Sequence, residues 1–115
     1  MTFWVASWLR AFGITLLVEL PIALLLLAPV EPRLLRRASA VAVANLATHP
    51  LVWFLFPGLA IGAGARLALS EACAVLVELA IYRIVWPSLS IRRAALVSVA
   101  ANVASLVVGL VWLRG

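Results

Sequence analysis

The sequence predicts an all-α membrane protein, a bundle of four transmembrane helices forming a single domain over residues 1–115. The first observation is composition: 67% of the residues are hydrophobic and 11% are charged, whereas a soluble domain is roughly half apolar and a quarter charged. The second is that four apolar stretches are each long enough to cross a bilayer, which takes about 20 helical residues. The third is that these stretches are continuous and lack the period-two alternation of β-barrel strands. The composition therefore excludes a soluble globule and a disordered chain.

The four predicted spans follow one another through short connections. They cover residues 11–30, 38–57, 67–86 and 94–113. The breaks between them are PVEP at 29–32, PG at 57–58 and PS at 87–88. Proline just past the end of a helix cannot continue it, and glycine supplies the positive φ angles expected in turns. We expect no extramembrane domain in the remaining residues, so the bundle itself or a partner must carry the function.

The arginines predict the orientation, because cytoplasmic loops are rich in positive charge. Six lie on the side of the first and third connections: Arg33, Arg36, Arg37, Arg83, Arg92 and Arg93. Three lie on the other side: Arg10, Arg66 and Arg114. We therefore expect both termini outside the cytoplasm, in the plasma (inner) membrane of a bacterium. Tryptophans near the predicted span ends would anchor the helices at the interface; they are Trp4, Trp8, Trp53, Trp86 and Trp112.

The net charge of +5 could suggest a nucleic-acid partner, since basic patches attract phosphate. The arginines, however, lie singly or in pairs at the edges of apolar runs and form no polar face. The expected partner is therefore the lipid bilayer, and no nucleic acid is expected.

Each predicted span contains polar residues that lipid does not tolerate well. A charged side chain at the bilayer centre costs about 2.5–3.5 kcal/mol on insertion scales, so such residues usually face the bundle interior. At 100° per residue, each span carries a stripe of polar residues, such as Asn45 and His49 in the second span. The stripes fall at similar depth, which predicts a shared polar core. The candidates for binding a proton or cation are Glu19, His49, Glu71 and Glu78, and their polar partners are Asn45, Thr48, Tyr82 and Asn102.

This core has acidic groups but no arginine at the same depth. A buried carboxyl group without a cationic partner becomes neutral only by binding a proton or a cation. One hypothesis is thus a small proton- or cation-coupled transporter or a channel-like protein. The alternative is that the same groups only form hydrogen bonds between helices, in a non-catalytic subunit or scaffold of a larger membrane complex. Either function is compatible with a homo-oligomer.

No catalytic residue is predicted, because no nucleophile–base pair is evident, and the protein is not expected to be an enzyme. Glu19, His49 and Glu78 could supply three metal ligands, but the paired Glu-x-x-His motifs of bundle metal sites are absent. We therefore expect no metal and no cofactor.

Two local features complete the prediction. Pro21 and Pro50 lie inside spans next to ionisable residues, and each should kink its helix and free a carbonyl group. Ala101, Ser105 and Gly109 form a ladder of small residues that favours close helix packing within the bundle.

Several strings in the spans resemble those of small bacterial membrane proteins with four spans. They are ELP at 19–21, NLATHP at 45–50, the pair of glutamates and the tyrosine between 71 and 82, and S-N-S-G between 98 and 109. The resemblance covers nearly the whole chain and implies the same four-span fold, but it implies no activity and no catalytic residue. Small multidrug exporters are similar in size and in having a glutamate in the first span. Their tryptophan and tyrosine motifs are not matched, so that similarity is architectural only.

Overall fold

The structure is a computed structural model that describes the backbone of residues 3–114 and the side chains of residues 5–112. The side chains of Trp4 and Arg114 lie outside this described part. The described chain is all-helical and has four long helices: α1 (Phe3–Leu27), α2 (Leu34–Pro50), α3 (Ala63–Val85) and α4 (Ile91–Arg114). Beyond Pro50, α2 continues as a π-helical turn (Leu51–Leu55) and a short 3-10 turn (Phe56–Gly58).

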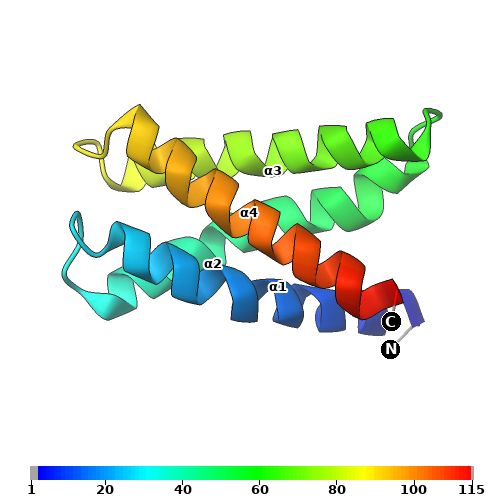
Figure 1. The fold of residues 1–115 in the computed structure, drawn as a ribbon, viewed down its shortest axis with the longest axis horizontal. Helices are drawn as coiled ribbons and strands as arrows, with labels where there is room; N and C mark the ends of the chain where they lie inside the picture. The colour runs from blue at the N-terminus through cyan, green and yellow to red at the C-terminus, as the bar shows by residue number, and fades with distance from the viewer. Residues whose placement is uncertain (1–2, 115) are drawn as a thin grey trace.

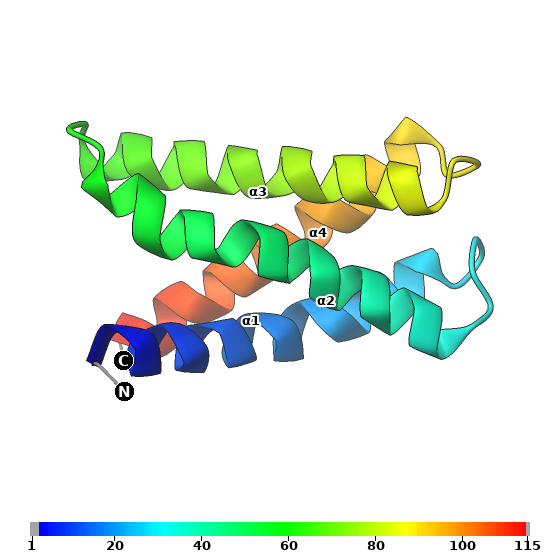
Figure 2. The same ribbon diagram turned by 180° about the vertical axis from the view of Figure 1, so that it is seen from behind.

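The helices form a bundle in which each packs against two neighbours. α1 contacts α2 and α4, and α3 contacts the same two helices from the opposite side. The α1–α2 and α3–α4 loops lie at one end of the bundle, here called the loop end (Figures 1 and 2). The α2–α3 turn, the start of α1 and the end of α4 lie at the other end, here called the terminal end. The longest dimension is 39 Å, which exceeds the hydrocarbon thickness of about 30 Å.

Three of the four predicted spans are helices long and apolar enough to cross a membrane: Val5–Leu27, Leu34–Gly58 and Ile91–Trp112. The fourth, α3, is long enough at 23 residues but does not qualify by composition. It carries Arg66, Glu71, Glu78 and Arg83, more charge than a uniformly apolar span contains.

The helices begin several residues before the predicted spans. α1 starts at Phe3 and not at residue 11, and α4 starts at Ile91 and not at residue 94. The predicted spans begin just after flanking arginines, but arginine is a good helix former. Its long side chain can lie along the apolar surface while its charge stays at the interface. The helical ends therefore run through Arg10 and Arg92.

The prediction that glycines supply positive φ angles in the turns is wrong. No residue in the described part of the chain has a positive φ. Gly62 caps the start of α3 in an extended conformation, with φ −61° and ψ 154°. A side chain stabilises the turn before it: the guanidinium group of Arg66 donates to the carbonyl oxygens of Leu59 and Ile61, at 3.3 and 2.7 Å.

An apolar core fills the loop-end half of the bundle. It contains large buried side chains, including Leu27, Tyr82 and Leu89, and small ones, including Ala23 and Ala44, where helices approach closely. Large apolar residues also cover the outside, where leucines such as Leu17 and Leu25 are about three-quarters exposed at 76% and 75%. This outward-facing apolar surface suits contact with lipid.

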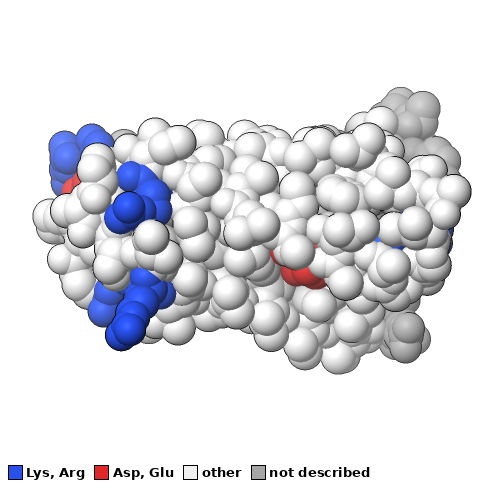
Figure 3. Space-filling view, turned by 90° about the horizontal axis from the view of Figure 1, so that it is seen from above, with Lys and Arg blue, Asp and Glu red and all other residues white. Residues whose placement is uncertain are grey.

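Arginines concentrate at the loop end, as the space-filling view shows (Figure 3). Arg37 and Arg93 donate to the carbonyl oxygens of Leu24 and Leu26 in the last turn of α1. The final carbonyl groups of a helix have no partner within the helix and carry partial negative charge. The arginines therefore satisfy the end of α1 and fix the two loops against it.

Candidate functional site

A cavity of about 340 Å³ lies between the four helices in the terminal half of the bundle. It reaches from the mid-level of the bundle towards the terminal end, where lining residues such as Leu110 and Trp112 are exposed. Six of the eight residues predicted for the polar core line it: Glu19, Asn45, Thr48, His49, Glu71 and Asn102. Glu78 and Tyr82 lie outside its wall.

Glu19 projects from α1 into this cavity and is only 1% exposed. It belongs to a row at four-residue spacing in which Ala23 and Leu27 are also buried, and this spacing keeps the side chains on the inner face of a helix. Its Oε2 accepts a hydrogen bond of 2.6 Å from the hydroxyl group of Ser105 on α4. Its Oε1 is buried and has no hydrogen-bond partner among the described residues.

Glu78 on α3 is fully buried directly behind the cavity. Its Oε2 accepts hydrogen bonds from the amide of Asn102 on α4, at 3.2 Å, and from the hydroxyl group of Thr48 on α2, at 3.4 Å. The carboxyl groups of Glu19 and Glu78 are close enough to interact. Polar contacts at this level thus join α2, α3 and α4, and the bond between Glu19 and Ser105 adds α1.

His49 on α2 lies among aromatic rings from α1 and from its own helix. Its Nε2 is 3.3 Å from the hydroxyl oxygen of Thr15. Its ring centroid is 5.2 Å from that of Phe12, edge-on, and 6.4 Å from that of Trp53, nearly parallel. Its Nδ1 is buried without a hydrogen-bond partner in the described structure.

The two prolines have different effects. The change from α-helix to π-helix follows Pro50 directly, in line with the break expected where proline removes a hydrogen bond. The π-helical turn places Trp53 beside the cavity. α1, in contrast, remains one helix through Pro21.

The other candidates occupy less central places. Glu71 is half-buried and lines the cavity from α3, close enough to interact electrostatically with Glu19 and Glu78. Asn45 lines the cavity, but its amide donates within its own helix, to the carbonyl oxygen of Val41 at 2.9 Å. Tyr82 lies in the apolar core beside Trp86, with ring centroids 6.3 Å apart. The structure thus places Tyr82 away from the cavity.

The predicted ladder of small residues on α4 is used only in part for helix packing. Ala101 is buried and Ser105 binds Glu19. Gly109, in contrast, lines the cavity, and a Cβ atom added there would meet no atom within 4 Å. The absent side chain at Gly109 leaves space open and does not serve close helix contact.

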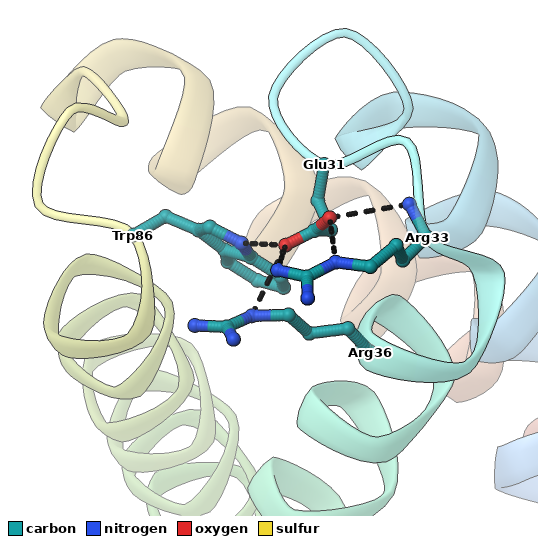
Figure 4. A network of polar contacts seen from close by, with 4 residues as sticks. All are labelled: Glu31, Arg33, Arg36 and Trp86. Atoms are coloured by element: carbon teal, nitrogen blue, oxygen red, sulfur yellow. Dashed lines mark hydrogen bonds and ion pairs between the residues drawn. The ribbon is translucent and has the colours of Figure 1, made fainter.

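Glu31, which is not among the residues predicted for the site, forms the main ionic network at the loop end (Figure 4). Glu31 lies in the α1–α2 loop and is 5% exposed. Its Oε2 accepts from the backbone N–H and Nε of Arg33, both at 3.1 Å, and its Oε1 forms an ion pair with Nε of Arg36 at 3.0 Å. Its Oε1 also accepts from the indole N–H of Trp86 at 3.2 Å.

The hydrogen bonds from Arg33, and that from Trp86, lower the pKa of Glu31 from 4.5 to about 2 despite its burial. The group is therefore ionised at neutral pH and ties the α1–α2 loop to the end of α3. A sequence signal did exist: Glu31 is the only acidic residue between the first two predicted spans, a stretch that contains three arginines. Its contact with Trp86, 55 residues away, depends on the tertiary structure.

Chemically, the cavity combines two carboxyl groups and an imidazole with largely apolar walls, and no arginine among the described side chains lines it. Within the described residues, no three side chains of His, Cys, Asp or Glu are grouped so as to hold a metal ion. Comparison of the chain with protein-family models, curated proteins and solved structures finds no match. The function must therefore be inferred from the geometry of the site.

Proposed function

We propose that this protein is a small four-span membrane transporter that takes up a proton or a cation at Glu19. The observation that carries the proposal is the one-sided cavity. It reaches Glu19 from the terminal end, while the apolar core and the Glu31 network fill the loop end. A pathway that is accessible from one side at a time is what a carrier requires. The same geometry favours a carrier over an open channel.

The proposal includes α3 as the fourth span. α2 ends at the terminal end and α4 begins at the loop end (Figure 1), so α3 has to cover the length between them. Its 23 residues extend about 34 Å at 1.5 Å per residue. Arg66 and Arg83 lie near its two ends, where long side chains reach the interface. Glu78 is buried inside the bundle, as expected for an acidic residue in a span.

The orientation follows from the charge at the loop end. Positive residues favour the cytoplasmic side, so we propose that the loop end faces the cytoplasm of a bacterial cell and that the cavity faces outward. Single cysteines at Ser88 in the α3–α4 loop and at Gly62 in the α2–α3 turn test this, after replacement of Cys73 by Ala. A membrane-impermeant maleimide applied to intact cells should label position 62 and not position 88. Labelling of both or of position 88 alone would contradict the proposed topology.

Transport is tested by reconstituting the purified protein in liposomes with a pH gradient and a trapped pH-sensitive dye. Glu19→Gln and Glu78→Gln should each abolish pH-dependent flux, because each removes a carboxyl group while keeping side-chain volume. Ser39→Ala is the matched control, since Ser39 is exposed on the outer surface of α2. If both glutamine variants show flux at the wild-type rate, the proposed role of these carboxyl groups is refuted.

The second candidate function is a non-catalytic subunit or scaffold of a larger membrane complex. The polar contacts between helices support it as well, because they stabilise a bundle whether or not anything is transported. It predicts no flux for the isolated wild-type protein. It also predicts a partner that is retained through extraction in mild detergent and that is lost in Glu78→Gln.

A further inference from the structure

We infer that the cavity binds a hydrophobic organic monocation, an amine or a quaternary ammonium ion, with the charged nitrogen beside Glu19. The inference rests on the proposed function but concerns only what is bound. It begins with the carboxyl group of Glu19, which lines the cavity and is 1% exposed. Its Oε1 accepts no hydrogen bond from the described residues, although the side chains of Asn45 and Glu78 are close enough to interact with the group. Such a group requires a positive partner when it is ionised.

The acidic groups around the cavity favour a cation. Glu71 faces it from α3, His49 lines it from α2, and Glu78 lies behind it. Among its described side chains, α4 contributes only neutral polar groups to the lining, Asn102 and Ser105. Within side chains 5–112, no arginine in the lining supplies a competing positive charge.

The remaining walls fit an organic ion. The other side chains that line the cavity are mostly apolar, such as Leu106 and Leu110, and two of them, Trp53 and Trp112, carry indole rings. Aromatic faces attract organic cations, and apolar walls favour their hydrocarbon groups. A volume of about 340 Å³ falls in the range of about 300–1,000 Å³ that is typical of small-molecule sites.

A hydrated inorganic cation fits less well. Ca²⁺ and Mg²⁺ need roughly six to eight oxygen ligands, but Oε2 of Glu19 is already bound to Ser105. The amide of Asn45 is engaged with its own helix.

Calorimetric titration of the purified protein in a non-ionic detergent tests the inference, with benzyltrimethylammonium as the probe. Wild-type protein should bind it, and Glu19→Gln should weaken binding at least tenfold. Gly109→Leu should abolish binding by filling the cavity without touching a polar group. Gly13→Leu is the matched control: Gly13 also lies in a helix with nothing within 4 Å of an added Cβ, but it does not line the cavity. It should bind like wild type.

The inference is overturned if wild-type protein does not bind the probe. It is also overturned if Glu19→Gln binds as tightly as wild type, which would indicate a neutral occupant, or if Gly109→Leu leaves binding intact. Displacement of the probe by NaCl or MgCl₂ at equal concentration would indicate an inorganic cation and would overturn it too. Binding without flux in liposomes refutes transport and leaves this inference standing. Proton flux without binding does the reverse.

Discussion

Replacing Ser105 by Ala tests whether the polar core holds α4 against α1. The hydroxyl group of Ser105 lies 2.6 Å from Oε2 of Glu19, and this bond joins two helices that pack closely along the bundle. In Glu19→Leu the hydroxyl group keeps a second acceptor, the carbonyl oxygen of Asn102 at 3.1 Å. A double-mutant cycle between Ser105→Ala and Glu19→Leu therefore isolates the contact without leaving the serine unsatisfied.

The expected coupling energy follows from the environment of the bond. Hydrogen bonds between membrane helices average about 0.6 kcal/mol and reach about 1.7 kcal/mol. The contact between Ser105 and Glu19 is short and its acceptor is buried, which favours the upper part of that range. We expect a coupling free energy of about 1–1.7 kcal/mol, with Ser105→Ala destabilising the bundle by a similar amount.

The measurement is reversible unfolding in mixed detergent micelles, followed by far-UV circular dichroism. Ser39→Ala serves as control and should change the free energy of unfolding by less than about 0.5 kcal/mol, because Ser39 is exposed. A coupling energy indistinguishable from zero would refute the reasoning and would mean that packing alone holds α1 and α4 together.

Three further outcomes are expected. Leu27→Ala should destabilise the bundle by about 2–4 kcal/mol, because Leu27 is fully buried. Leu25→Ala, at a site that is 75% exposed, should destabilise it by less than about 0.5 kcal/mol. Equal changes in the free energy of unfolding in the same assay would contradict the packing described. The pKa of Glu31, about 2 against 4.5, means that its ionised network stabilises the fold fully above pH 4.5 and that this contribution is lost as the pH falls towards 2. Glu31→Gln should therefore show a smaller drop in thermal unfolding temperature between pH 6 and pH 3 than wild type, and an equal drop would refute this. Pro50→Ala restores a backbone donor and should slow amide hydrogen exchange at Leu51–Leu55, and unchanged exchange would show that proline does not cause the π-helical turn.

Much of the polar core could be predicted from sequence because helical spacing is regular. Glu19 and Thr15 had to share a face of α1, as did Asn45 and His49 on α2, and all four line the cavity. An acidic residue in a span is expected to face inward. The sequence could not give the rotation of each helix about its axis to within one residue. Side-chain packing sets that rotation.

Tyr82 shows the consequence of this limit. It shares a stripe with Glu78, but one helical turn further on the stripe has passed from the polar level into the apolar core. Gly109 is a second example of a feature that the sequence could not decide. A small residue permits either close helix contact or open space, and only the packing of α4 against α1 determined that it borders the cavity.

The sequence by itself determined that the chain is helical and apolar, where the connections between its helices lie, and which side chains must avoid lipid. These properties depend on composition and on the period of a single helix. The tertiary structure alone decided that the cavity lies in the terminal half, that one oxygen of Glu19 stays unpartnered within it, and that Glu31 meets Trp86. Those contacts join residues on different helices, so they depend on how the helices are shifted and rotated against one another.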